Sequence, residues 1–355
     1  MTVHDPLIAA ASRTKNAIPD DAAMLRAAAD LTRELSTARP GIYWPDLLAS
    51  AFIGYAALAG AIISGNGAFM LAFGLVAVLA LYRAASFIHE LTHIRKGALP
   101  GFRLGWNLIV GIPLMIPSFL YEDVHTQHHA RTRYGTANDP EYLPLALMKP
   151  WSLPLFIIVA VLAPVGLILR FAVLTPLSLI IPPLRRKVVA EFSALSINPA
   201  YRRRAPEGEF ARQWAWQEAG ASLFALALVG SVLAFGWKPL LTYMAVHSAM
   251  TVINQLRTLV AHLWENEGEA MTVTAQYLDS VNVPPPSPLA AIWAPVGLRY
   301  HALHHLLPSV PYHALGEAHK RLVATLESDS PYHRGNYPGM WPLVSKIARS
   351  TMAKR

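Results

Sequence analysis

The chain has 355 residues, of which 54% are hydrophobic and 15% are charged, whereas a soluble domain typically carries about 25% charged residues. This balance predicts a multi-pass membrane protein. The chain has no cysteine, which excludes disulfides, cysteine-ligated zinc, iron–sulfur clusters and thiol nucleophiles within it, and its net charge of +8 favours basic cytoplasmic loops over nucleic-acid binding.

The first 40 residues are polar and charged, and we expect a soluble N-terminal lead with a short helix. Within this lead, DDAAMLRAAADLTREL (20–35) places helix-forming residues behind aspartate caps. A basic start followed by an apolar core is missing, so no cleaved signal peptide is expected. Residues 41–355 are expected to form one membrane domain.

Four apolar segments approach the roughly 20 residues that a membrane-spanning helix needs. They form two pairs with tight turns between them, and the second segment runs directly into the sequence HELTH. The expected spans are about 46–65, 68–88, 214–236 and 239–263. The proline-interrupted apolar run 151–183 is too short for two spans and too long for one untilted span, so we expect a re-entrant or interfacial segment there.

Basic residues indicate how these spans are oriented. Lysine and arginine gather after HELTH, near 131–133, and at 185–187 and 202–204, whereas the two tight turns hold only Lys238. By the positive-inside rule the turns face outward and the remaining loops face the cytoplasm. The sequence therefore predicts an all-α, multi-pass helical bundle with a cytoplasmic helical cap.

Eight of the 14 histidines fall into three short clusters. On a helix, spacings of three and four residues place side chains on one face, one turn apart. Crowded imidazoles repel each other once protonated, so their clustering points to metal binding. The clusters are HELTH (His89, His93), HTQHH (His125, His128, His129) and HALHH (His301, His304, His305).

Eight histidines are more than one catalytic zinc ion needs, since such an ion takes three protein ligands and a water. They suit two ions, each with four or more nitrogen ligands. Imidazole binds zinc, copper, iron and nickel alike, so ligand type does not name the metal. Roughly octahedral sites with open positions fit iron and oxygen chemistry better than zinc hydrolysis.

Taken together, HELTH, HTQHH and YHALHHLLPSVPYHAL resemble the three histidine boxes of the membrane fatty-acid desaturase and hydroxylase superfamily, and the third box looks like that of the desaturase branch. The resemblance covers about residues 44–320 and implies a non-haem centre of two iron ions that uses O2. It implies that the eight clustered histidines are ligands and adds His262 as a ninth. Some relatives have an asparagine four residues before that histidine, where this chain has Thr258.

Three acidic residues are candidates for supporting these ligands. Asp123 and Asp139 flank HTQHH and could orient imidazoles through their second N–H groups, although capping and turn roles are equally open. Glu90 points about 100° away from the face that carries His89 and His93. We therefore expect Glu90 to be a supporting or solvent-facing residue rather than a ligand.

The predicted activity is O2-dependent desaturation of a long acyl chain linked to a lipid, to CoA or to a carrier protein. The alternative is hydroxylation of such a chain, because the two reactions differ by small displacements of the substrate. Electrons would come from a separate donor such as a ferredoxin or cytochrome b5-like protein. The basic segments 185–187 and 202–204 could dock an acidic donor or attract anionic lipid.

Two other classes of protein remain possible from the sequence alone. H-E-x-x-H is also a zinc protease signature in which Glu90 would be the catalytic base, and Asp279 is the closest match to the third ligand. This interpretation leaves six histidines without a role. A transporter with a histidine-lined metal site is the other class, but transport sites are expected near the bilayer midplane.

Overall fold

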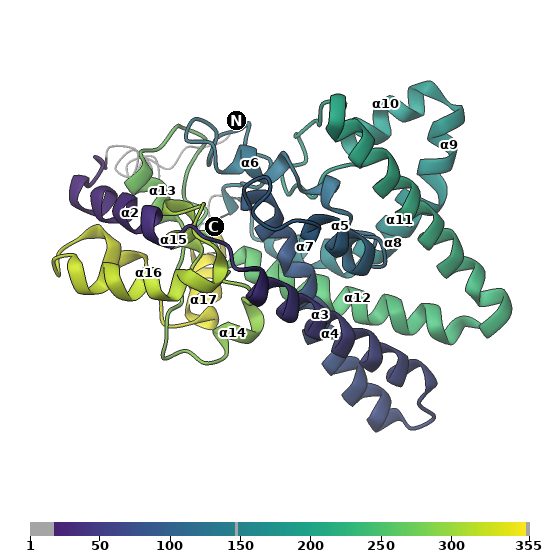
Figure 1. The fold of residues 1–355 in the computed structure, drawn as a ribbon. Helices are drawn as coiled ribbons and strands as arrows, with labels where there is room; N and C mark the ends of the chain where they lie inside the picture. Colours follow the sequence, from purple (N-terminus) through teal and green to yellow (C-terminus); the bar gives the residue numbers. More distant parts are fainter. Residues whose placement is uncertain (1–17, 146–147, 353–355) are drawn as a thin grey trace.

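The computed structural model describes residues 18–145 and 148–352. Within these ranges the chain is helical and has isolated β-bridges but no strands. Long apolar helices form a bundle, and shorter helices form a cap beside it (Figure 1). This arrangement confirms the predicted all-α fold and is consistent with a multi-pass bundle.

The helices α3 (Pro40–Ile63) and α4 (Gly67–His93) form an antiparallel hairpin. Asn66 ends the turn between them, because its side-chain oxygen accepts the N–H groups of Ala68 and Phe69. Gly54 allows the two helices to approach closely, since a Cβ atom there would lie 2.6 Å from Leu81. The helix α4 continues to His93, so HELTH is the last turn of a long apolar helix.

A second hairpin consists of α11 (Gly208–Phe235) and α12 (Trp237–Leu259). Gly236 joins them with a φ of 71°, a conformation that residues with a Cβ atom rarely adopt. The outer surface of this hairpin is apolar; Leu233, for example, is 94% exposed. Such exposed apolar side chains on long helices are what a lipid environment would cover.

Within the described ranges, four helices are long and apolar enough to cross a membrane: Pro40–Ile63, Gly67–His93, Ala163–Ile180 and Gly208–Phe235. The helix α12, which occupies most of the expected span 239–263, is not one of them. Its C-terminal half carries Asn254, Gln255 and Arg257, and these polar side chains lower its hydropathy. The third helix, Ala163–Ile180, lies in the run for which we expect a re-entrant or interfacial path.

The run 151–183 contains α7 (Ser152–Val161) and then α8 (Ala163–Ile168), a π-helical stretch η4 (Leu169–Leu174) and α9 (Thr175–Ile180). Pro164 and Pro176 lie in the first turns of α8 and α9, where a missing N–H group costs little. The buried Arg170 forms an ion pair with Glu218 at 2.5 Å. The helix α10 (Pro182–Glu191) follows.

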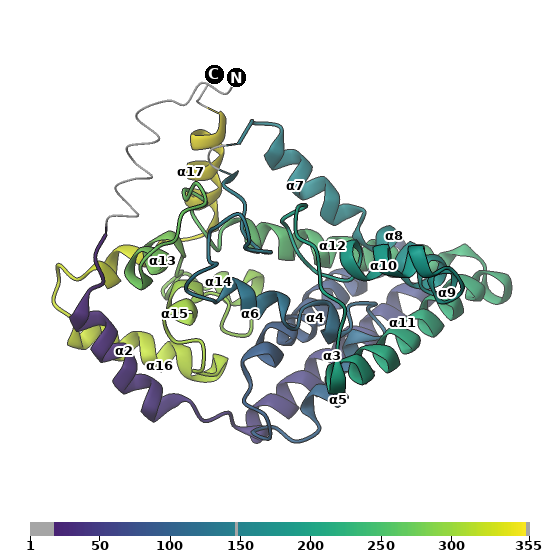
Figure 2. The same ribbon diagram turned by 90° about the horizontal axis from the view of Figure 1, so that it is seen from above.

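Seen from above, the cap lies on one side of the bundle (Figure 2). Its helix α2 (Ala22–Leu35) packs Met24, Ala28 and Leu31 into a core shared with α16 (Tyr312–Thr325). The helix α2 therefore belongs to the cap, while residues 1–17 of the expected lead lie outside the described residues. The cap also contains α13 (Val273–Asp279), α14 (Ala290–Trp293), α15 (His301–Leu306), the 3-10 turn η5 (Pro331–Gly335) and α17 (Met340–Met352).

The connection from the first hairpin to the cap contains α5 (Phe102–Trp106), the π-helical stretch η1 (Asn107–Gly111) and the 3-10 turn η2 (Ser118–Leu120). It then forms α6 (Val124–His128), which carries the second histidine cluster. The side chain of Asn107 bonds the backbone N–H of Ser118 at 2.8 Å. This contact fixes the chain just before it enters α6.

Candidate metal centre

The structure brings all nine predicted histidines together where α4, α6 and α15 meet. They form two groups, and within each group one ligand atom per residue lies within 4.8 Å of all the others. Group one is His89, His93, His125, His129 and His304, and group two is His128, His262, His301 and His305. Each group could hold one metal ion.

Helix geometry explains how two clusters serve both groups. In HTQHH, His125 and His129 are four residues apart and enter group one, whereas His128 enters group two. In HALHH, His301 and His305 enter group two, whereas His304 enters group one. Neighbouring residues on a helix point about 100° apart, so the sequence HxxHH divides its imidazoles between two adjacent sites.

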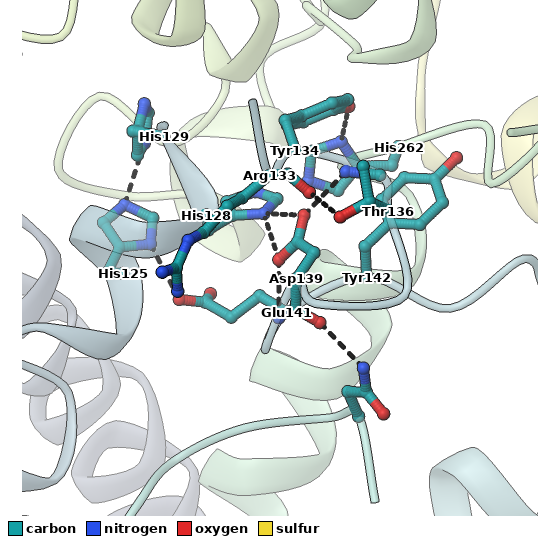
Figure 3. Close-up of polar contacts among 12 residues, drawn as sticks. His125, His128, His129, Arg133, Tyr134, Thr136, Asp139, Glu141, Tyr142 and His262 are labelled. Carbon is teal, nitrogen blue, oxygen red and sulfur yellow. Dashed lines mark hydrogen bonds and ion pairs between the residues drawn. The ribbon is translucent and has the colours of Figure 1, made fainter. Parts of the chain in front are cut away.

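Carboxylates contact the Nδ1 atoms of two histidines on α6, His125 and His128 (Figure 3). His128 Nδ1 lies 2.9 Å from Asp139 Oδ2, and His125 Nδ1 lies 2.9 Å from Glu141 Oε1. The hydroxyl of Tyr121 lies 2.8 Å from the same Nδ1 atom of His125 and donates to Glu141. An imidazole that donates Nδ1–H to a carboxylate keeps the lone pair on Nε2 for a metal ion.

His262 follows the end of α12, and two hydroxyl groups from other parts of the chain lie against its imidazole. Its Nδ1 atom lies 2.9 Å from the hydroxyl of Tyr134 and 3.3 Å from that of Ser280. Tyr134 and Tyr142 both donate to the buried Asp279. Asp279 is thus hydrogen-bonded to two tyrosines and is absent from both histidine groups, which removes it as a zinc ligand beside His89 and His93.

The Nε2 atoms converge on each other in a way that fits metal ligands. His304 Nε2 lies 3.1 Å from His93 Nε2 and 3.2 Å from His129 Nε2, and His262 Nε2 lies 3.0 Å from His301 Nε2. Both ring nitrogens of His89 are buried without a hydrogen-bond partner. Buried nitrogen atoms that lack a hydrogen-bond partner, or that meet only another nitrogen, destabilise the fold. A metal ion bound between these nitrogen atoms would remove that cost.

Burial also sets the protonation state of these rings. It lowers the pKa of His125, His129, His301, His304 and His305 well below the ordinary value, and neighbouring histidines lower it further. The imidazoles are therefore neutral at physiological pH, the form that binds metal. For His128, burial acts in the same direction, but Asp139 outweighs it and the pKa is raised.

The candidates for supporting residues have different positions in the structure. Asp139 contacts an imidazole, as its proximity to HTQHH suggested. Asp123 does not: it begins α6 with a φ of 67°, and its carboxylate lies 3.4 Å from the side-chain nitrogen of Gln127. Thr258 lines a cavity beside the histidines. Glu141, two residues after Asp139, was missed, although the sequence DPE holds both carboxylates.

Glu90 is buried but turns away from the metal groups. Its carboxylate accepts the hydroxyl of Tyr43 and the backbone N–H of Tyr312, and its nearest approach to His89 Nδ1 is 4.0 Å, too long for a hydrogen bond. Glu90 therefore connects α4 to α3 and α16, and no part of this geometry presents it as a catalytic base.

We predict that Glu90→Gln keeps its metal and loses less than about tenfold in activity. Both hydrogen bonds end on Oε2, and an amide oxygen in that place can still accept them. Metal content and turnover of purified protein measure this. Tyr43→Phe, which removes a donor to the same carboxylate, is the matched control and should behave similarly. Complete loss with Glu90→Gln but not with Tyr43→Phe would instead support a hydrolytic role for Glu90.

A cavity of about 260 Å³ lies directly beside the histidines. His89, His128, His262 and His301 form part of its wall, and much of the rest comes from α4, α7, α8 and α12. The side toward α7 and α8 is apolar, with Val159, Ala160 and Ala163. The cavity is therefore a partly apolar space that adjoins both histidine groups.

Comparisons with known proteins agree with this geometry. The sequence model described as "Fatty acid desaturase" matches residues 65–336. A protein named ceramide hydroxylase from Caulobacter vibrioides (strain NA1000 / CB15N) is 48% identical over 337 residues, which cover 94% of this chain and 95% of that protein. No solved structure matches the chain.

Proposed function

This chain belongs to the fatty acid desaturase family, and we propose that it is a membrane hydroxylase that inserts one oxygen atom from O2 into ceramide. The observation that carries this proposal is the 48% identity to a protein named ceramide hydroxylase over 94% of this chain. The paired histidine groups beside a cavity support it, because that arrangement suits an oxidation of an unactivated C–H bond.

This proposal corrects the expectation of desaturation. The third histidine box, with its trailing Leu-Pro, favoured the desaturase branch, yet the relative with near-complete coverage is named a hydroxylase. The two reactions share metal ligands, so the motifs that identify the family do not separate them. The similarity over the whole chain favours the hydroxylase alternative.

We infer two iron ions as the metals, one for each histidine group, and such a pair supplies the activation of O2. The protein residues have separate tasks. Asp139 and Glu141 orient His128 and His125, and Tyr134 orients His262. The cavity holds the lipid and keeps bulk water from the reacting C–H bond.

Electrons for this reaction come from outside the chain. One molecule of O2, two electrons and two protons convert a C–H bond to C–OH and release one molecule of water. We propose that a separate one-electron carrier delivers both electrons in turn, because no cysteine is present to hold an iron–sulfur cluster. Ferredoxin-like and cytochrome b5-like proteins are carriers of this kind.

We also infer that the histidine groups face the cytoplasm. The turn between α3 and α4 holds no lysine or arginine, and the turn between α11 and α12 is followed only by Lys238. Arg95, Lys96 and Arg103 follow the metal-bearing end of α4. This charge distribution supports a cytoplasmic metal centre under the positive-inside rule.

Lipid analysis tests the proposed activity. Membranes that contain ceramide and the protein are supplied with a reduced carrier and isotopically heavy O2, and the lipids are measured by mass spectrometry. The expected product is ceramide that has gained one heavy oxygen atom. Ceramide that has lost two hydrogen atoms and gained no oxygen would show a desaturase instead.

A basic groove near α6 is our candidate docking site for the carrier. Arg133, Arg202 and Arg204 line it together with Tyr201 and Gln127. The hydroxyl of Tyr201 lies 3.0 Å from the side-chain nitrogen of Gln127, which sits between His125 and His128 on α6. An acidic carrier in this groove would therefore lie close to both metal groups.

We predict that the double variant Arg202→Glu, Arg204→Glu raises the KM for a reduced acidic ferredoxin by about threefold to tenfold, since exposed ion pairs contribute about 0.2–1 kcal/mol each. Added salt should raise the KM of the unaltered protein, so that the KM values of the unaltered protein and the double variant become more similar. Lys320→Glu, an exposed change on α16, is the control. An unchanged KM at low salt would place the carrier elsewhere.

A further inference from the structure

The cavity beside the metal groups has a polar wall as well as an apolar one. Four of its polar side chains come from the last turns of α12: Asn254, Gln255, Arg257 and Thr258. These residues lie just before His262 in the chain. The polar wall is therefore next to the metal groups, whereas Val159, Ala160 and Ala163 form the wall toward α7 and α8.

Arg257 is the charged residue of this wall, and its hydrogen bonds are incomplete. One terminal nitrogen donates to the side-chain oxygen of Asn254 at 3.2 Å, and the guanidinium lies near the hydroxyl of Tyr82. Its Nε atom is buried without a hydrogen-bond partner. Within residues 18–145 and 148–352, no carboxylate oxygen lies close enough to Arg257 to form an ion pair.

Arg170 and Arg203 are more deeply buried than Arg257, and each of them has several acceptors. Arg170 pairs with Glu218 and also bonds Ser193, and Arg203 donates to three backbone carbonyls. Glu141 is close enough to be influenced by the charge of Arg257, but it is bonded to His125 and Tyr121. A buried donor without an acceptor is costly, so Arg257 is prepared for an acceptor that enters the cavity.

The position of Arg257 defines where that acceptor would lie. Arg257 lines the same cavity as His262 and His301, and it also lines a second, small cavity together with His301. An oxygen atom bound to Arg257 would therefore sit beside group two. If that oxygen atom belongs to the substrate, the carbon atoms next to it would be the ones nearest the metal groups.

We propose that Arg257, supported by Asn254, binds the amide carbonyl oxygen of the ceramide and so selects a C–H bond within a few bonds of the amide, not one in the middle of the acyl chain. This inference rests on the proposed hydroxylase function and adds the position of attack. Arg257 presents a planar donor group that suits a carbonyl oxygen, and the apolar wall of α7 and α8 receives the chain beyond it.

Fragmentation mass spectrometry of the hydroxylated product tests the position directly. The expected hydroxyl lies on a carbon close to the amide. A hydroxyl in the middle or at the end of the chain would overturn this inference and leave the hydroxylase function intact. A double bond without oxygen would overturn the function instead, so the two failures are distinguishable.

Variants at position 257 test whether Arg257 binds the ceramide. Arg257→Met should keep its metal content, lower kcat/KM for ceramide by about tenfold or more, and spread the hydroxyl over several carbons. It should also weaken the binding of a fluorescent short-chain ceramide to metal-free protein. Arg257→Lys should restore part of the affinity, and Arg212→Met, an exposed change on α11, should alter nothing. Unchanged affinity and an unchanged hydroxyl position in Arg257→Met would refute the role of Arg257.

Discussion

Replacing His304 with alanine should abolish the O2-dependent product. Its Nε2 atom lies 3.1 Å from that of His93 and 3.2 Å from that of His129, so this one imidazole joins all three histidine boxes through α4, α6 and α15. Without it, group one keeps four histidines but loses the one contributed by the cap. Removing this imidazole should lower the rate by about a hundredfold to a thousandfold, the scale of losing one group that stabilises the reacting centre.

Metal content and product formation measure this effect together. Purified unaltered protein should hold nearly two iron ions per chain, and His304→Ala nearly one. His333→Ala, which alters a histidine outside both groups, should leave the metal and the product unchanged. One zinc ion and no iron in the unaltered protein, or full activity in His304→Ala, would contradict the di-iron centre.

Most of the candidate ligand set could be predicted from the sequence because these histidines follow helix periodicity. His89 and His93 share a helix face at a spacing of four residues, and the two HxxHH clusters repeat that spacing. Such local geometry needs no knowledge of the fold. What the spacing does not specify is the division into groups. The second histidine of HTQHH, His128, joins His262 and two rings from α15, which depends on how the helices meet.

The partners of the ligands were harder to find from the sequence. Asp139 was found because it lies close to HTQHH in the chain. The same proximity made Asp123 an equal candidate, and in the structure its carboxylate lies beside Gln127. Tyr134 and Ser280, which hold His262, are separated by 146 residues. Only the packing of the cap against the end of α12 brings them together, and no local pattern contains that information.

The hairpins could be predicted for a similar reason, whereas the path of the region between them stays a prediction. Apolar length identifies α3, α4 and α11, because a buried or lipid-facing helix must be apolar along one turn after another. The end of α12 breaks this rule, since Asn254, Gln255 and Arg257 face the cavity beside the metals. In the run 151–183, prolines suggested interruptions, but Pro164 and Pro176 occupy first turns where a helix tolerates them.

Two neighbouring carboxylates should control the two metal ions separately. Asp139 accepts hydrogen bonds from His128 and from the backbone N–H groups of Gly135 and Glu141, and it serves group two. Glu141 bonds His125 and Tyr121, and it serves group one. We predict that Asp139→Asn weakens the ion of group two and Glu141→Gln that of group one, each by about 10–100-fold, the usual effect of losing such a partner.

The two variants are matched controls for each other, because they lie two residues apart in one loop and each exchanges a carboxylate for an amide. Metal titration of each protein should show one tight site and one weakened site, and both variants should lose activity, since the proposed oxygen insertion would need both ions. Combining Asp139→Asn with His128→Ala should cause little further loss, because both changes act on the same ion, whereas combining Asp139→Asn with Glu141→Gln should weaken both sites. If either single variant weakened both ions equally, the division of the nine histidines into two separately supported sites would be wrong.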